Sequence, residues 1–135
     1  MSGPNSDVPP VGVLVCDDTP ELLWLVRTQL ETHPGVRVVG EATDGDAVIR
    51  LAAELRPDVI LLDLHMPGLG FGELVRKLSA LLPNTAIVTY SGIDPASLGD
   101  AEAAAAVAAH LPKTTDLHAV GRVVHDVGME RRSAY

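Results

Sequence analysis

Polar side chains stand at or just beyond the ends of four short apolar runs of the sequence. These residues are Asp17 and Asp18, Asp63, Ser91 and Lys113. Three carboxylates close together repel one another and need a cation or a shared proton, and oxygen ligands of this kind suit a hard divalent ion such as Mg²⁺. With an ammonium and a hydroxyl beside them, they could surround a transferring phosphoryl group, and Asp63 could be the nucleophile that forms an acyl phosphate.

The apolar patterning predicts five strands that alternate with five helices along the chain. The strands are expected over residues 11–16, 36–40, 59–63, 86–91 and 108–111. The first helix begins with Pro20 in its first turn, which is a favoured position for proline. Its predicted apolar face is Leu22, Leu25, Val26 and Leu30, which leaves Leu23 and Trp24 outside that face. Thr43 and Asp46 form a capping-box pattern for the second helix, and the alanine-rich residues 100–109 are expected to form the fourth.

This alternation indicates an α/β fold, a doubly wound five-stranded parallel sheet with helices on both faces. The branched apolar run from Val59 to Leu62 suits a strand that is buried on both faces. The flavodoxin-like strand order 2-1-3-4-5 is common for five strands, and it places strands one and three side by side at the switch point. The acids of both strands would then meet at the carboxyl edge of the sheet, where Ser91 and Lys113 also converge.

Composition excludes several classes of function. The formal net charge of -8 and the pI of about 4.9 argue against binding of nucleic acid or of an anionic membrane by this domain, because phosphate contacts need clustered Lys and Arg. The single cysteine, Cys16, cannot form an internal disulfide, which favours a cytoplasmic protein. We expect a flexible tail over residues 1–10, one domain over 11–129, and a C-terminal tail or the start of a linker over 130–135.

The ordered set of residues Asp17-Asp18, Asp63 followed by Met66-Pro67, Ser91-Gly92 and Lys113 resembles the receiver (response regulator) domain of bacterial two-component signalling. The resemblance extends from Val11 to Gly128. The segment from Glu54 to Gly68 is most similar to receivers that precede helix-turn-helix output domains.

This resemblance implies a role for each residue of the set. Asp63 is the phosphoacceptor for a histidine kinase or a small phosphodonor. Asp17, Asp18, Asp63 and the backbone carbonyl of His65 hold Mg²⁺, while Ser91 and Lys113 bind the phosphoryl oxygens. The domain would be a switch with at most slow self-catalysed phosphorylation and dephosphorylation, regulating transcription through an output domain outside this chain. A homodimer through the last helix-strand-helix face is also implied.

Some positions depart from the family pattern. His110 occupies the switch position, where Tyr or Phe is usual, so coupling from Ser91 to the last strand is expected to be weaker or pH-dependent. His65 and Ile93 occupy the two positions that tune phosphate lifetime in this family, and the bulky Ile93 is expected to slow attack by water. Phe71 replaces a usual glycine, which affects the geometry of its loop.

Other interpretations remain open from the sequence. The chain could be a pseudo-receiver that binds partners without phosphorylation. A Mg²⁺-dependent phosphatase of the haloacid dehalogenase type also uses an Asp nucleophile, but it needs a second Asp where His65 stands. Leu23 and Trp24 could pack against the N-terminal tail or form a docking patch for the kinase. The remaining histidines, His33, His118 and His125, lack metal-ligand spacing and are expected on the solvated surface.

Overall fold

A computed structural model describes residues 8–133 of the 135-residue chain. Its centre is a parallel sheet of five strands in the order β2-β1-β3-β4-β5, as predicted. The strands are β1 (Val11–Cys16), β2 (Val36–Ala42), β3 (Val59–Leu62), β4 (Ala86–Ser91) and β5 (Ala109–Pro112). β2 runs two residues past the expected end, because its pairing with β1 continues to Ala42.

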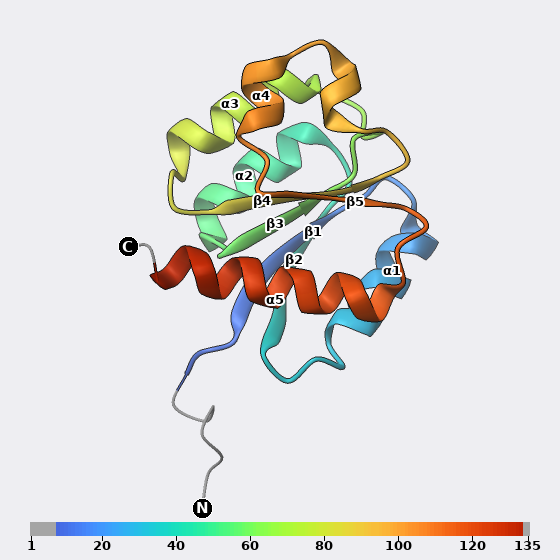
Figure 1. The fold of residues 1–135 in the computed structure, drawn as a ribbon, viewed down its shortest axis with the longest axis vertical. Helices are drawn as coiled ribbons and strands as arrows, with labels where there is room; N and C mark the ends of the chain where they lie inside the picture. The colour runs from blue at the N-terminus through green and yellow to red at the C-terminus, as the bar shows by residue number, and fades with distance from the viewer. Residues whose placement is uncertain (1–7, 134–135) are drawn as a thin grey trace, which may run out of the picture.

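Helices cover both faces of the sheet (Figure 1). α1 (Pro20–Leu30) and α5 (Leu117–Ser133) lie on one face, and α2 (Gly45–Leu55), α3 (Phe71–Leu81) and α4 (Ala101–Ala105) lie on the other. A short 3-10 helix, η1 (Pro95–Leu98), precedes α4. In β3, Val59 and Leu61 belong to the core under α1 and α5, whereas Ile60 and Leu62 belong to the other core. Every side chain of this strand is therefore buried, as expected for a central parallel strand.

The buried face of α1 differs from the prediction. Leu23, Val26 and Leu30 are buried, whereas Leu25 is 45% exposed and Leu22 is only partly buried. The near-continuous apolar stretch at residues 22–26 contains two overlapping helical stripes, and packing on the sheet selects the one that includes Leu23. Trp24 lies outside the core, as predicted, and is 65% exposed.

Two other helices begin or end differently from the sequence prediction. Asp44, rather than Thr43, is the N-cap of α2, and its carboxylate accepts a hydrogen bond from the backbone N–H of Ala47 at 2.8 Å. α4 covers only residues 101–105. The following alanines leave the helix because the N–H of Ala108 pairs with the carbonyl of Ile87, which draws the chain into β5.

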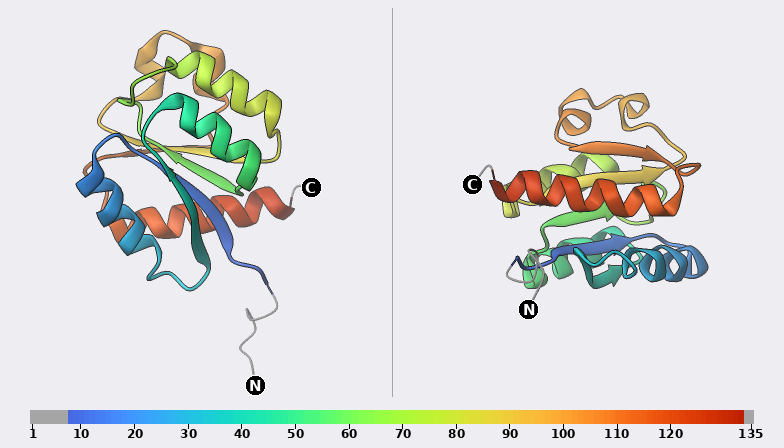
Figure 2. Two further views of the ribbon diagram at one scale, coloured as in Figure 1. Left: turned by 180° about the vertical axis from the view of Figure 1, so that it is seen from behind. Right: turned by 60° about the horizontal axis from the view of Figure 1, so that its bottom comes forward.

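α5 continues to Ser133, through residues that we expected to be frayed. Arg132 explains this extension. Its guanidinium forms an ion pair with Asp58 at 2.8 Å, just before β3, and donates hydrogen bonds to the carbonyls of Pro9 and Pro10, just before β1. Figure 2 shows the start of β1 and the end of α5 on the same side of the molecule. Residues 1–7, most of the predicted tail, lie outside the described residues.

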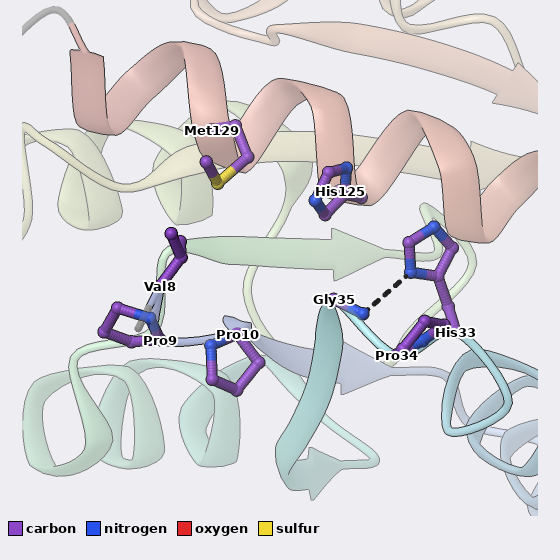
Figure 3. Close-up of a pocket in the computed structure, with 8 residues that line it drawn as sticks. All are labelled: Val8, Pro9, Pro10, His33, Pro34, Gly35, His125 and Met129. Carbon is purple, nitrogen blue, oxygen red and sulfur yellow. Dashed lines mark hydrogen bonds between the residues drawn. The ribbon is translucent and has the colours of Figure 1, made fainter. Parts of the chain in front are cut away.

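A pocket lies near the starts of β1 and β2, away from the carboxyl edge of the sheet (Figure 3). It is lined by Val8, Pro9, Pro10, His33, Pro34, Gly35, His125 and Met129. The rings of His33 and His125 stack here with centroids 4.9 Å apart, and Nδ1 of His33 accepts a hydrogen bond from the N–H of Gly35. Both histidines are only partly exposed, whereas His118 is exposed as predicted.

His33 should make the fold less stable in mild acid. Burial lowers the pKa of His33 below its ordinary 6.5, and His125 and His118 lower it further, while Asp126 opposes them. Because the unfolded chain then binds this proton at a higher pH than the folded chain, stability falls as the pH drops through 6.5 towards the folded pKa. We expect the urea midpoint to fall between about pH 7.5 and pH 5.5, and His33→Gln to remove part of that fall. An equal effect of His65→Gln, which changes an exposed histidine elsewhere on the molecule, would contradict this assignment.

Candidate functional site

Three carboxylates meet at the carboxyl edge of the sheet. Asp17 and Asp18 follow β1, and Asp63 follows the adjacent strand β3. Oxygen atoms from all three side chains lie within 4.8 Å of one another. The backbone N–H of Asp63 donates to the carbonyl of Cys16 at 3.0 Å, which fixes the two strand ends together. Asp17 and Asp63 are buried and Asp18 is exposed, so the cluster opens to solvent on one side.

Lys113 brings the opposite charge into this cluster. Its Nζ lies 2.8 Å from Oδ2 of Asp17 and 3.7 Å from Oδ2 of Asp63. The remaining carboxylate oxygens of the two buried acids accept backbone hydrogen bonds, Asp17 from Thr19 at 2.9 Å and Asp63 from His65 at 3.2 Å. Such bonds stabilise ionised carboxylates that have left water. One ammonium does not balance three carboxylates, so the site keeps a net negative charge that attracts a cation.

The oxygen ligands of this cluster fit Mg²⁺. The ion prefers a few carboxylates and keeps several waters, and the exposed side at Asp18 leaves room for them. The structure therefore shows a clustered set of acids that could bind a metal, formed by the three residues predicted from the sequence. His65 contributes its backbone N–H to Asp63, and its side chain is exposed.

Two hydroxyls lie near the end of β4, the strand next to β3. Ser91 is fully buried, and its Oγ accepts a hydrogen bond from the N–H of Ile93 at 3.2 Å. Thr89 is also fully buried, and its Oγ1 lies 2.7 Å from Nδ1 of His110 on β5. Thr89 is therefore engaged with His110, which leaves Ser91 as the hydroxyl at the strand end.

The loop after Asp63 turns at Pro67 and Gly68. Gly68 has φ +99°, a conformation that glycine adopts without strain. The carbonyl of Pro67 accepts a hydrogen bond from the N–H of Gly45, which ties this loop to the start of α2. Phe71 begins α3 and is partly buried against the core of that face. The loop thus accommodates Phe71 by turning its side chain inward.

Tyr90 is a residue near the site that the sequence analysis treated only as part of a strand. It is 6% exposed, and its ring centroid lies 5.1 Å from Nζ of Lys113. Burial raises the pKa of its phenol, so the hydroxyl stays protonated near neutral pH. Strand alternation places Tyr90 on the opposite face from Ser91. The same alternation could have predicted from the sequence that Tyr90 approaches Lys113. Cys16, in contrast, is the small buried side chain that we predicted, and burial raises the pKa of its thiol.

The response regulator receiver domain family matches residues 13–125, and the chain belongs to this family. It is a receiver domain of two-component signalling.

Individual relatives agree with this assignment. The solved signal receiver domain of the putative response regulator NarL from Mycobacterium tuberculosis is 33% identical, with a TM-score of 0.79 over 90% of this chain and 98% of that one. The nitrate/nitrite response regulator protein NarL of Escherichia coli is 41% identical over 64% of this chain and 40% of its own length. A protein-glutamate methylesterase/protein-glutamine glutaminase of Nocardioides is 32% identical over 89% of this chain and 33% of its own length.

The two curated relatives are longer than the segment that they share with this chain. The chain spans 33% of the length of the Nocardioides protein and 40% of the length of the Escherichia coli NarL protein. Within residues 8–133, no helix has the length and apolar character needed to cross a membrane.

Proposed function

We propose that this receiver is a phosphorylation-controlled switch in which Asp63 is the phosphoacceptor. The observation that carries the proposal is the position of the Asp63 carboxylate, buried beside Lys113 and the two acids that follow β1. A carboxylate oxygen of Asp63 forms a bond to phosphorus as the bond from phosphorus to the donor atom breaks. The electron pair of the broken bond leaves with the donor, a histidine of a kinase or a small acyl phosphate.

The surrounding residues stabilise the charge of the transferring group. Lys113 and Ser91 bind two of its oxygens, the first as an ammonium and the second as a hydroxyl donor. Asp17, Asp18, Asp63 and the backbone carbonyl of His65 would hold Mg²⁺, which supplies positive charge to the phosphoryl oxygens. Ile93 lies partly buried next to Ser91, and we propose that its apolar side chain restricts water and lengthens the life of the acyl phosphate.

Incubation with acetyl phosphate tests this proposal. With Mg²⁺ present, intact-mass measurement should show the addition of one phosphoryl group, and beryllofluoride should bind in its place when supplied with Mg²⁺. Chelation of the metal should abolish both results. If neither modification nor binding occurs, the chain is a phosphorylation-independent interaction module.

The partner that delivers the phosphoryl group is proposed to dock on α1. Trp24 is exposed there and borders a shallow groove on this helix, which begins two residues after Asp18. The groove is lined by Pro20, Leu23, Trp24, Arg27, Thr28, Glu31 and Glu41. Leu23 is buried in the core, which leaves Trp24 as the exposed aromatic anchor.

Replacement of Trp24 by Ala should therefore change the phosphorylation rate with a histidine kinase but not with acetyl phosphate. We expect phosphotransfer from a histidine kinase that phosphorylates the wild type to slow about tenfold, because exposed aromatic anchors dominate such interfaces. The rate with acetyl phosphate should not change. Leu81→Ala, which removes another exposed apolar side chain, on α3, is the control. Equal rates for Trp24→Ala and the control with the kinase would exclude this docking site.

The contact between His110 and Thr89 bears on the output of the switch. This hydrogen bond holds the His110 ring beside β4, so the ring responds less readily when Ser91 engages a phosphoryl group. We expect His110→Tyr to strengthen beryllofluoride-driven dimerisation in sedimentation experiments, and Thr89→Val to do so as well by releasing His110. Dimerisation identical to that of the wild type in both variants would refute this coupling.

Three further parts of the proposal concern the setting of this domain. We infer that it acts in the cytoplasm, that a phosphorylated homodimer forms through the face of α4, β5 and α5, and that transcription is regulated by an output domain outside this chain. The acidic net charge of -8 supports leaving nucleic-acid contacts to that other domain.

A further inference from the structure

Tyr90 contacts Lys113 in two ways. Its ring centroid lies 5.1 Å from the ammonium of Lys113, and its hydroxyl lies 3.4 Å from the carbonyl oxygens of Lys113 and Thr115. The ring face attracts the cation, and the hydroxyl donates to the loop that carries that cation. Both contacts therefore act on the position of the same side chain.

The sheet register explains why these residues meet. Tyr90 pairs with Leu111 across β4 and β5, and Lys113 lies two residues farther along. Side chains two residues apart point to the same face, so Lys113 lies diagonally across from Tyr90 on the α1 and α5 side. Tyr90 also lines the small space behind the two buried acids, Asp17 and Asp63.

Lys113 has two competing acidic partners. Its ammonium is closer to Asp17, at 2.8 Å, than to Asp63, at 3.7 Å. If the flexible lysine side chain were free to pair with Asp17 alone, its ammonium would bind a phosphoryl group on Asp63 less strongly. An aromatic face on one side of the ammonium limits this freedom.

We propose that Tyr90 is a positioning residue that holds the ammonium of Lys113 where it meets the phosphoryl group on Asp63. This inference rests on the proposed phosphoacceptor function of Asp63. Tyr90 precedes Ser91 in β4 and acts from the opposite face of that strand. The ring supplies most of the effect, and the hydroxyl supports the loop.

The proposal is tested by measuring how tightly Tyr90→Phe and Tyr90→Leu bind beryllofluoride in the presence of Mg²⁺. Fluorine NMR follows the binding. Tyr90→Leu should weaken the affinity about fivefold, and Tyr90→Phe should weaken it by about twofold or less, because it keeps the ring. Mg²⁺ affinity, measured by calorimetry without beryllofluoride, should fall by clearly less than the beryllofluoride affinity in Tyr90→Leu, because the ring acts on Lys113 and not on the acids themselves. Val88→Ala, which truncates a buried residue on the same face of β4, controls for general loosening of the strand.

A second readout needs no phosphoryl analogue. The ε-methylene protons of Lys113 should carry an upfield ring-current shift that Tyr90→Phe keeps and Tyr90→Leu loses. An absent shift in the wild type would overturn the positioning role. So would equal beryllofluoride affinity in Tyr90→Leu and the wild type, a matching loss in Val88→Ala, or a proportional loss of Mg²⁺ affinity. Failure of the wild type to bind beryllofluoride, with the shift present, would instead overturn the phosphoacceptor function.

Discussion

Asp63→Asn is expected to abolish phosphorylation by both acetyl phosphate and a histidine kinase. The amide keeps the size and shape of the carboxylate but lacks the nucleophilic oxygen that forms the acyl phosphate. Intact-mass measurement after incubation with acetyl phosphate and Mg²⁺ should show no added phosphoryl group. The variant should stay folded, because the substitution also removes one of three clustered negative charges.

Asp58→Asn is a matched control for this experiment. Asp58 precedes the same strand and pairs with Arg132, far from the acidic edge, so its loss should affect stability and leave phosphorylation intact. If Asp63→Asn still gained a phosphoryl group, peptide mapping would identify a different acceptor and the assignment of Asp63 would be wrong.

Lys113→Ala is expected to damage both catalysis and stability. Loss of a fixed positive charge at a transferring phosphoryl group should slow phosphorylation by acetyl phosphate about 10²- to 10³-fold. Without Mg²⁺, the free energy of unfolding should fall by about 3 kcal/mol, because Asp17 is left buried without its ion-pair partner. Added Mg²⁺ should restore part of the stability and little of the rate.

Urea unfolding with and without Mg²⁺ and initial phosphorylation rates measure these two effects separately. Lys113→Arg keeps the charge and should retain more stability than Lys113→Ala, although its planar guanidinium does not match an ammonium in geometry. An initial rate for Lys113→Ala equal to that of the wild type would show that Lys113 does not act on the phosphoryl group.

The sheet and the acidic edge were predictable from the sequence for a simple physical reason. Parallel strands bring their carboxyl ends to one edge, so the polar residues after β1, β3 and β5 had to meet once the strand order was assigned. Asp17, Asp18, Asp63 and Lys113 follow this rule. Topology therefore determined which side chains meet, although they are distant in sequence.

Details that depend on a choice between neighbouring residues were not predictable. In α1, Leu22, Leu23 and Leu25 are equally apolar, so only packing on the sheet could show that Leu23 is buried. The pairing of Thr89 with His110 depends on the register of β4 against β5 and on the ring orientation. The stack of His33 on His125 joins a loop to a distant helix, and no periodic pattern predicts such a contact.

The guanidinium of Arg132 has a practical consequence for engineering this domain. Because one side chain anchors both the entrance to the first strand and the exit of the last helix, the two ends of the fold are mechanically linked. A fusion partner that pulls on the end of α5 would therefore disturb the start of β1 as well. Fusions should leave Arg132 and its proline carbonyl partners untouched.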